Sequence, residues 1–87
     1  RWSDGMLSAP HGWEVKNNHL EKTFEFKTFL KTMSFVNAVA WVANAQNHHP
    51  EIVVNFNNCI IRTTTHDANN TVTEKDILLA EAIEKLG

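Results

Sequence analysis

The chain has 87 residues, a formal net charge of −2 and a hydrophobic fraction of 43%. A chain of this length forms one domain, and this share of apolar residues is typical of a globular protein and not of a disordered one. Because it carries no basic block, neither nucleic acid nor an anionic membrane is expected as a direct partner.

The cysteine count and the hydropathy pattern exclude further classes. Cys59 is the single cysteine, so neither a disulfide framework nor a Cys-Cys metal knuckle can form, and its apolar neighbours predict a buried, inert thiol. No apolar run is long enough to span a membrane and no signal peptide is visible, so we expect a cytoplasmic protein, with a nuclear pool left open. Residues 1–11 are expected to form an irregular N-terminal segment, and residues 12–87 a single domain.

Two strands are predicted first. Apolar and charged residues alternate over residues 13–17 and again in about 20–27, which is the period of half-buried strands. The Asn17-Asn18 pair between them tolerates positive φ. These residues therefore predict a β-hairpin.

Residues 28–47 change to a helical period. Thr28 can cap the start of this helix. Pro50 disfavours helical geometry at the residue before it, so the helix should end near Asn47 or His48. The expected apolar stripe consists of Phe29, Met33, Val36, Ala40 and Ala43, widened by Phe35, Val39 and Val42.

A second hairpin and a second helix follow. Residues 51–57 and 59–65 are rich in β-branched and aromatic side chains, with a turn expected at Asn57-Asn58. Thr73 then caps a last helix, and Asp76 completes an Asp variant of the capping box. The order strand, strand, helix, strand, strand, helix predicts an α+β, two-layer fold, with a four-stranded antiparallel sheet and the helices packed on one face.

Three of the five histidines stand at the ends of predicted elements. His48 and His49 follow the long helix, and His66 follows a strand. Element ends that meet at one edge of a sheet can form a pocket. In contrast, His11 and His19 are predicted to be solvated surface imidazoles.

The residues alone leave more than one interpretation of these histidines open. A three-histidine zinc site is one of them, although adjacent ligands do not easily point at one ion and the His-x-x-x-His spacing of helical ligands is absent. In another, His48 caps the C-terminus of the helix, where the helix dipole favours a cation.

The stretch NHHPEIVVNFNNCIIRTTTHD, residues 47–67, resembles the core motif of the pterin-4a-carbinolamine dehydratases. That motif has His-His-Pro at a helix end, an aromatic residue six positions later, a further His ten positions on, and an Asp after a short loop. The resemblance covers residues 12–86, and positions that are often acidic in the family are Asn44 and Asn47 here. The matching residues are His48, His49, Pro50, Phe56, His66 and Asp76, with further matches at Gly12-Trp13, at Phe24 to Lys27 and at Thr73 to Asp76.

The resemblance implies an enzyme that removes water from 4a-hydroxytetrahydropterin to give quinonoid dihydropterin, which recycles the cofactor of aromatic amino acid hydroxylases. Such an enzyme needs no metal and no organic cofactor. By the resemblance, His48 and His66 are the acid and base, and His49 binds and polarises the pterin. The resemblance also implies pterin contacts from Pro50, Thr65, Asp67 and Ala68.

Roles outside the chemistry are expected for three further residues. Trp13 is expected either to form a wall of the pocket or to lie in the core or an interface. Phe56 is assigned to the core. Asp76 is expected to cap the last helix and to help shape the pocket.

The expected partners are a small pterin substrate and further copies of the chain, in a homodimer or homotetramer. The alternative is a non-catalytic interaction protein on the same fold, because animal members of the family also assist the dimerisation of a transcription factor. A scaffold has no need of all three histidines, so the complete set favours the enzyme.

Overall fold

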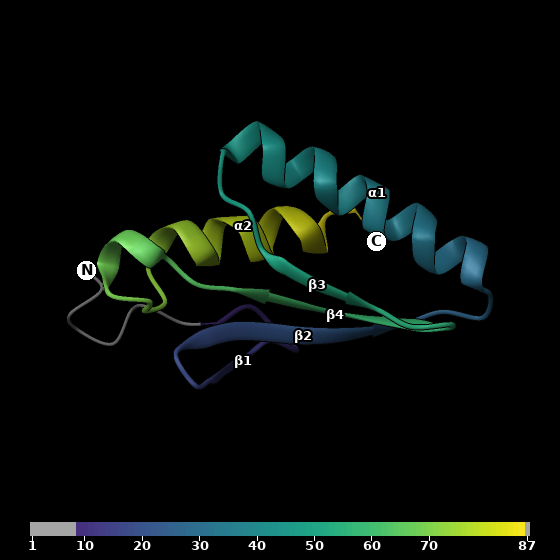
Figure 1. Ribbon diagram of the computed structural model, residues 1–87, viewed down its shortest axis with the longest axis horizontal. Coiled ribbons are helices and arrows are strands. Elements are labelled where there is room, and N and C mark those ends of the chain that lie inside the picture. Colours follow the sequence, from purple (N-terminus) through teal and green to yellow (C-terminus); the bar gives the residue numbers. More distant parts are fainter. Residues whose placement is uncertain (1–8, 87) are drawn as a thin grey trace.

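The computed structural model describes residues 9–86. The predicted order of elements is confirmed, and a short 3₁₀ helix precedes the last helix (Figure 1). Residues 1–8 of the segment predicted to be irregular, and Gly87, lie outside the described residues. The elements are β1 (Glu14–Lys16), β2 (His19–Glu25), α1 (Phe29–Gln46), β3 (Glu51–Val54), β4 (Asn58–Thr63), η2 (His66–Ala68) and α2 (Glu74–Glu84).

The four strands form one antiparallel sheet in the order β1-β2-β4-β3. Asn17 and Asn18 form the first hairpin turn with φ angles of 50° and 66°, a left-handed conformation that asparagine tolerates better than most residues. The central pair runs from Leu20 opposite Thr63 to Glu25 opposite Asn58. This register places the end of β4, and the residues that follow it, beside the start of β2.

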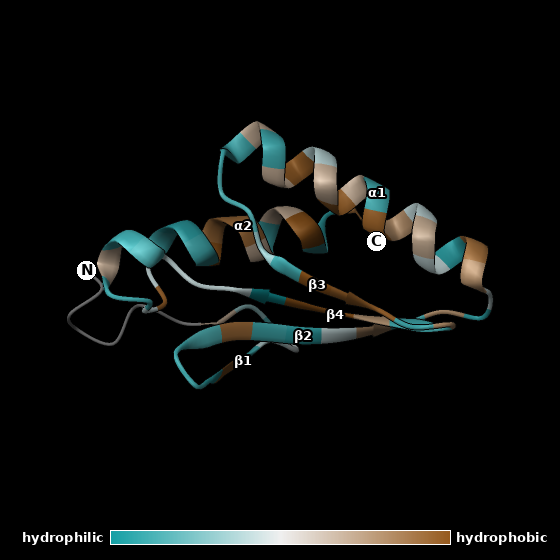
Figure 2. Ribbon diagram, viewed as in Figure 1, coloured by the Kyte–Doolittle hydropathy of each residue, from teal (hydrophilic) through white to brown (hydrophobic). Residues whose placement is uncertain are grey.

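Both helices lie on the same side of the sheet (Figure 1), so the predicted α+β two-layer fold is confirmed. Figure 2 shows hydrophobic residues gathered in β3, β4 and the middle of α2, which border the core. Burial of this apolar surface is the main stabilising contribution in a domain of this size. The buried core consists of Trp13, Leu20, Val39, Ala43, Cys59, Ile61, Ile77, Leu79, Ala80 and Ile83.

The buried face of α1 differs from the predicted stripe. Thr32, Val39 and Ala43 are buried, whereas Phe29 and Ala40 are exposed. Thr32 can occupy a core position because its hydroxyl donates to the carbonyl of Thr28 at 2.9 Å, so no polar atom is left without a partner. The prediction counted apolar residues alone and so missed Thr32, which shares the buried face with Val39 and Ala43.

The second hairpin turn also differs from its prediction. β3 ends at Val54 and β4 begins at Asn58, so the connection is residues 55–57 and not the Asn57-Asn58 pair. Phe56 lies at the tip of this connection and is 68% exposed. Its assignment to the core is therefore wrong: α1 reaches this turn through the hydroxyl of Thr32, which donates to the carbonyl of Phe56 at 3.3 Å, and the Phe56 side chain is left in solvent.

Trp13 lies in the core, with 5% of its surface exposed. Its Nε1 donates a hydrogen bond of 2.8 Å to Glu84 of α2, and Lys22 of β2 donates to the same carboxylate oxygen at 2.7 Å. Burial raises the pKa of Glu84, but the hydrogen bonds from Lys22 and Trp13 and the charge of Lys22 outweigh it and lower that pKa. These contacts fasten the last helix to the first hairpin.

The helices α1 and α2 are both too short or too polar to cross a bilayer, and residues 9–86 contain no other candidate for a membrane span.

Candidate active site

The first part of the site is the chain reversal at the end of α1. Asn47 is the C-cap and adopts the left-handed conformation, with φ 53° and ψ 40°. The N–H of His48 donates to the carbonyl of Ala43 at 3.1 Å, and that of Asn47 donates to Asn44 at 3.2 Å. This is a common way for a helix to end, and asparagine is among the few non-glycine residues suited to it. The asparagine that departs from the family pattern therefore has a structural reason.

The second part is the segment that follows β4. Thr65 leads into η2, which begins at His66. His66 is exposed, and its Nδ1 lies 2.6 Å from Oδ1 of Asn70. Because the amide oxygen accepts, His66 carries its proton on Nδ1 and leaves Nε2 without a proton when the ring is neutral. Asn69 and Asn70, with φ of 61° and 58°, turn the chain back toward α2.

The two segments meet at a cavity of about 390 Å³. A cavity of this size is large enough for a bicyclic ligand. All three histidines singled out in the sequence border it, although they come from two segments that lie 17 residues apart. The complete lining is Asn47, His48, His49, Thr64, Thr65, His66, Asp67 and Lys75.

The remaining residues implied by the resemblance lie in or near this cavity. Thr65 and Asp67 line it. Ala68 lines an adjoining hollow of about 440 Å³ together with Thr65, Asp67 and Lys75. Pro50 follows the histidine pair but does not belong to the lining of either hollow. Their roles toward a substrate stay predictions.

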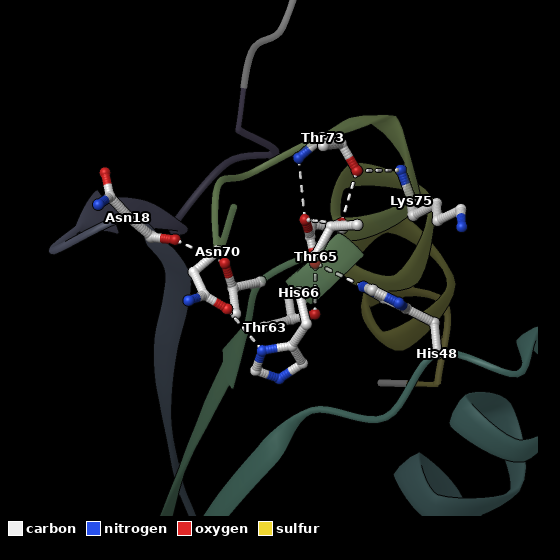
Figure 3. A network of polar contacts seen from close by, with 10 residues as sticks. Asn18, His48, Thr63, Thr65, His66, Asn70, Thr73 and Lys75 are labelled. Atoms are coloured by element: carbon white, nitrogen blue, oxygen red, sulfur yellow. Dashed lines mark hydrogen bonds and ion pairs between the residues drawn. The ribbon is translucent and has the colours of Figure 1, made fainter. Parts of the chain in front are cut away.

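Asp76 lies beneath the cavity and is fully buried, with 0% of its surface exposed. Its Oδ1 accepts from the hydroxyl of Thr63 at 2.6 Å and lies 2.6 Å from Nε2 of His48. Its Oδ2 accepts from the hydroxyl of Thr65 at 2.8 Å and from the N–H of Thr73 at 2.9 Å. Figure 3 shows these donors converging from β4, the start of α2 and the end of α1.

This network accounts for a charged group in the core. Burial raises the pKa of Asp76, but the hydrogen bonds from His48, Thr63, the Thr73 backbone and Thr65 together outweigh burial and hold that pKa below its ordinary value. Asp76 is therefore an ionised carboxylate with four hydrogen-bond donors around it. A buried carboxylate is tolerated only with partners of this kind.

The last helix begins at this same carboxylate. Thr73 and Asp76 form the predicted capping box, in which each side chain accepts from the other residue's backbone. The expectation that Asp76 caps α2 is thus confirmed. The interpretation of His48 as a cap for α1 is wrong, because its ring bonds to Asp76 and not to the carbonyls of the helix it follows.

Two features of the site were not predicted. Thr63 was assigned only to a strand, yet it donates to Asp76. Lys75 borders the cavity and both neighbouring hollows, including one of about 420 Å³ that it shares with Gln46 and Leu78. The sequence signal for Lys75 was weak, since a lysine in the first turn of a helix is usually a solvated surface residue.

The described part of the chain, residues 9–86, contains no group of three His, Cys, Asp or Glu side chains placed to hold a metal ion. The three-histidine zinc interpretation therefore has no ligand set there. The arrangement offers instead imidazoles, a buried carboxylate and hydroxyl groups, which transfer protons and form hydrogen bonds.

Comparison with known proteins places this chain in one family. Residues 3–86 match the family model described as pterin 4 alpha carbinolamine dehydratase, and the chain belongs to that family. The resemblance noted in the sequence is thus confirmed.

Bacterial relatives share much of the sequence. A protein of Nitrosomonas eutropha, provisionally named a pterin-4-alpha-carbinolamine dehydratase, is 41% identical to the chain over 81 residues. The alignment covers 93% of this chain and 71% of the relative. The chain is 46% identical over 76 residues to another protein with that name from Legionella pneumophila, covering 85% of this chain and 66% of the relative.

Solved structures agree with the fold. A Brucella melitensis protein described as a transcriptional coactivator/pterin dehydratase superimposes with a TM-score of 0.80 and 29% identity, covering 87% of this chain and 82% of that one. A pterin dehydratase-like protein described as a RuBisCO assembly factor in the alpha-carboxysome gives a TM-score of 0.74 at 22% identity, over 87% and 89% of the two chains. The second comparison supports the fold alone.

Proposed function

We propose that this protein dehydrates 4a-hydroxytetrahydropterin to quinonoid dihydropterin by histidine acid–base catalysis. The observation that carries the proposal is the convergence of His48, His49 and His66 on one cavity, with His48 held by the buried Asp76. Family membership supports a pterin as the substrate.

The reaction requires two proton transfers at neighbouring atoms. The C4a–O bond breaks as the hydroxyl group accepts a proton and leaves as water, and N5 loses its proton as the C4a=N5 double bond forms. One imidazole gives a proton and another accepts one, so the net protonation of the site is unchanged. Imidazole suits both steps because its pKa lies near neutrality.

The three histidines then have different tasks. We assign the acid and base to His48 and His66, whose rings are each oriented by a hydrogen-bond partner. His49 would bind and polarise the pterin ring, and Thr65, Asp67 and Ala68 would contact the edge of the pterin. Lys75 is added to this list because it borders the same cavity.

The test is a spectrophotometric assay of 4a-hydroxytetrahydropterin dehydration by the purified protein. We expect a rate well above that of the uncatalysed reaction, proportional to protein concentration. A folded protein without such activity would refute the proposal and favour the non-catalytic interaction protein.

We also propose that the chain self-associates through the outer face of α1. Leu30 and Trp41 are 76% and 77% exposed, and they lie on one side of the helix because eleven residues make about three turns. Lys31 is the single charged residue in α1. The exposure of two large apolar side chains on a helix with one charged residue supports the proposal.

Replacing Trp41 by glutamate is expected to shift the protein toward a smaller species in sedimentation velocity at matched concentration. The reason is that a carboxylate cannot be buried in an apolar contact without a partner. The control is Val15→Glu, which places the same charge on an exposed apolar residue of the edge strand β1. Equal sedimentation of wild type and Trp41→Glu would contradict the proposed surface.

A further inference from the structure

Each hydrogen bond around Asp76 has a defined direction. The hydroxyl of Thr65 donates to Oδ2 of Asp76, so its own oxygen, 2.6 Å from Oγ1 of Thr73, accepts from Thr73. The hydroxyl of Thr63 donates its one proton to Oδ1. An ionised carboxylate only accepts. The proton between Asp76 and His48 therefore belongs to Nε2 of His48.

The second ring nitrogen of His48 has a different environment. Among residues 9–86, Nδ1 of His48 has no hydrogen-bond partner. No buried side-chain nitrogen or oxygen of the described residues lacks a partner, so Nδ1 is accessible to solvent. His48 borders the cavity, which makes Nδ1 the nitrogen of this ring that is free to exchange a proton with a bound molecule.

We infer that Asp76 is a positioning residue for the proposed dehydration: it keeps the proton of His48 on Nε2, so that Nδ1 is the atom that exchanges a proton with the substrate. The inference rests on the proposed function for the identity of the substrate. The position of the proton on the His48 ring does not depend on that function. Asp76 itself makes no contact with the substrate, because it is fully buried.

The geometry also predicts the effect of an amide in place of the Asp76 carboxylate. In Asp76→Asn, the N–H of Thr73 can only donate, so the amide oxygen faces Thr73 and the amide nitrogen faces His48 and Thr63. The hydroxyl of Thr63 can rotate to accept. Nε2 of His48 must then accept as well, and the ring proton moves to Nδ1.

The experiment is a long-range proton–nitrogen NMR correlation on histidine-labelled protein, with the His48 signals assigned by His48→Gln. Above the pH at which the ring loses its charge, we expect the His48 proton on Nε2 in the wild type and on Nδ1 in Asp76→Asn. A wild-type His48 with its neutral-state proton on Nδ1 would overturn the inference, and this measurement stands even if the variant does not fold.

The same inference predicts a kinetic signature in Asp76→Asn. We expect kcat to fall by about 10²-fold or more, because the neutral ring then has no free nitrogen at the cavity to accept a proton, and the charged ring has lost its carboxylate partner. KM should change little, since no substrate contact is lost. A variant that keeps the wild-type tautomer and the wild-type kcat overturns the inference.

A destabilised control separates tautomer from stability. Thr63→Val removes one donor to Oδ1 but leaves Asp76 a carboxylate, so the proton of His48 should stay on Nε2 while the free energy of unfolding falls. The other titratable or charged groups at the cavity are His49, His66, Asp67 and Lys75, and all are unchanged in both variants.

Because the NMR measurement needs no substrate, a wild type with the expected tautomer but no dehydratase activity would refute the proposed function and not the role of Asp76 in fixing the ring.

Discussion

His48→Ala and His66→Ala are each expected to lower kcat/KM for dehydration by on the order of 10²–10⁴-fold, the usual contribution of one acid or base group. Each variant removes an imidazole at the cavity. The two losses should not add, since a reaction that needs both proton transfers already fails when one of them is missing. Initial rates of the single and double variants, measured over a range of pH, check this expectation.

The control for this pair is His19→Ala. His19 lies at the start of β2, with its Nδ1 near the carbonyl of Asn17 at 2.9 Å, and it does not border the cavity. Its removal should leave kcat/KM unchanged. If both cavity variants kept the wild-type rate while remaining folded, the assignment of His48 and His66 as acid and base would be wrong.

Leu79→Ala is expected to lower the free energy of unfolding by about 2–5 kcal/mol. Leu79 is fully buried, with 0% of its surface exposed, in the helix that also carries Asp76. A domain of this kind has roughly 5–15 kcal/mol of stability in total, so a large part would be lost. Urea unfolding followed by circular dichroism measures the change.

The neighbouring residue provides a matched control. Leu78 is 50% exposed, and Leu78→Ala should change the free energy of unfolding by no more than about 0.5 kcal/mol. Equal losses in the two variants would mean that Leu79 does not occupy the packed interior that the structure assigns to it.

The boundaries of the helices could be predicted because their caps are local signals. Thr28 lies directly before α1, and Thr73 with Asp76 forms the start of α2. Pro50 and Asn47 similarly mark the end of α1. Each of these residues acts on backbone groups within a few positions of itself, so the sequence contains the whole cause.

Phe56 shows where such local reasoning fails. A phenylalanine favours the core in most settings, but Phe56 belongs to the turn between β3 and β4, and its side chain is exposed there. The turn lies slightly earlier in the chain than the Asn57-Asn58 pair suggests. An error of this size in a turn is enough to move an aromatic side chain from interior to solvent.

The sequence indicated the histidines of the candidate site but not the threonine hydroxyls that bond Asp76. Thr63 and Thr65 lie two positions apart, so an extended chain turns both side chains to one side, while the hydroxyl of Thr64 bonds the carbonyl of Asn18 instead. That both hydroxyls meet Asp76 depends on how α2 packs against β4. This packing follows from contacts between distant segments, which periodicity does not reveal.

Asp76 joins the stability of α2 to the state of the His48 ring. The same carboxylate starts the last helix and fixes the ring of His48. A substitution that removes the side-chain oxygens of Asp76 therefore both releases the ring of His48 and weakens the start of a helix that contributes much of the core. Evolution at this position is constrained as a result, because a residue that replaces Asp76 must both accept from the backbone of Thr73 and bond the ring of His48.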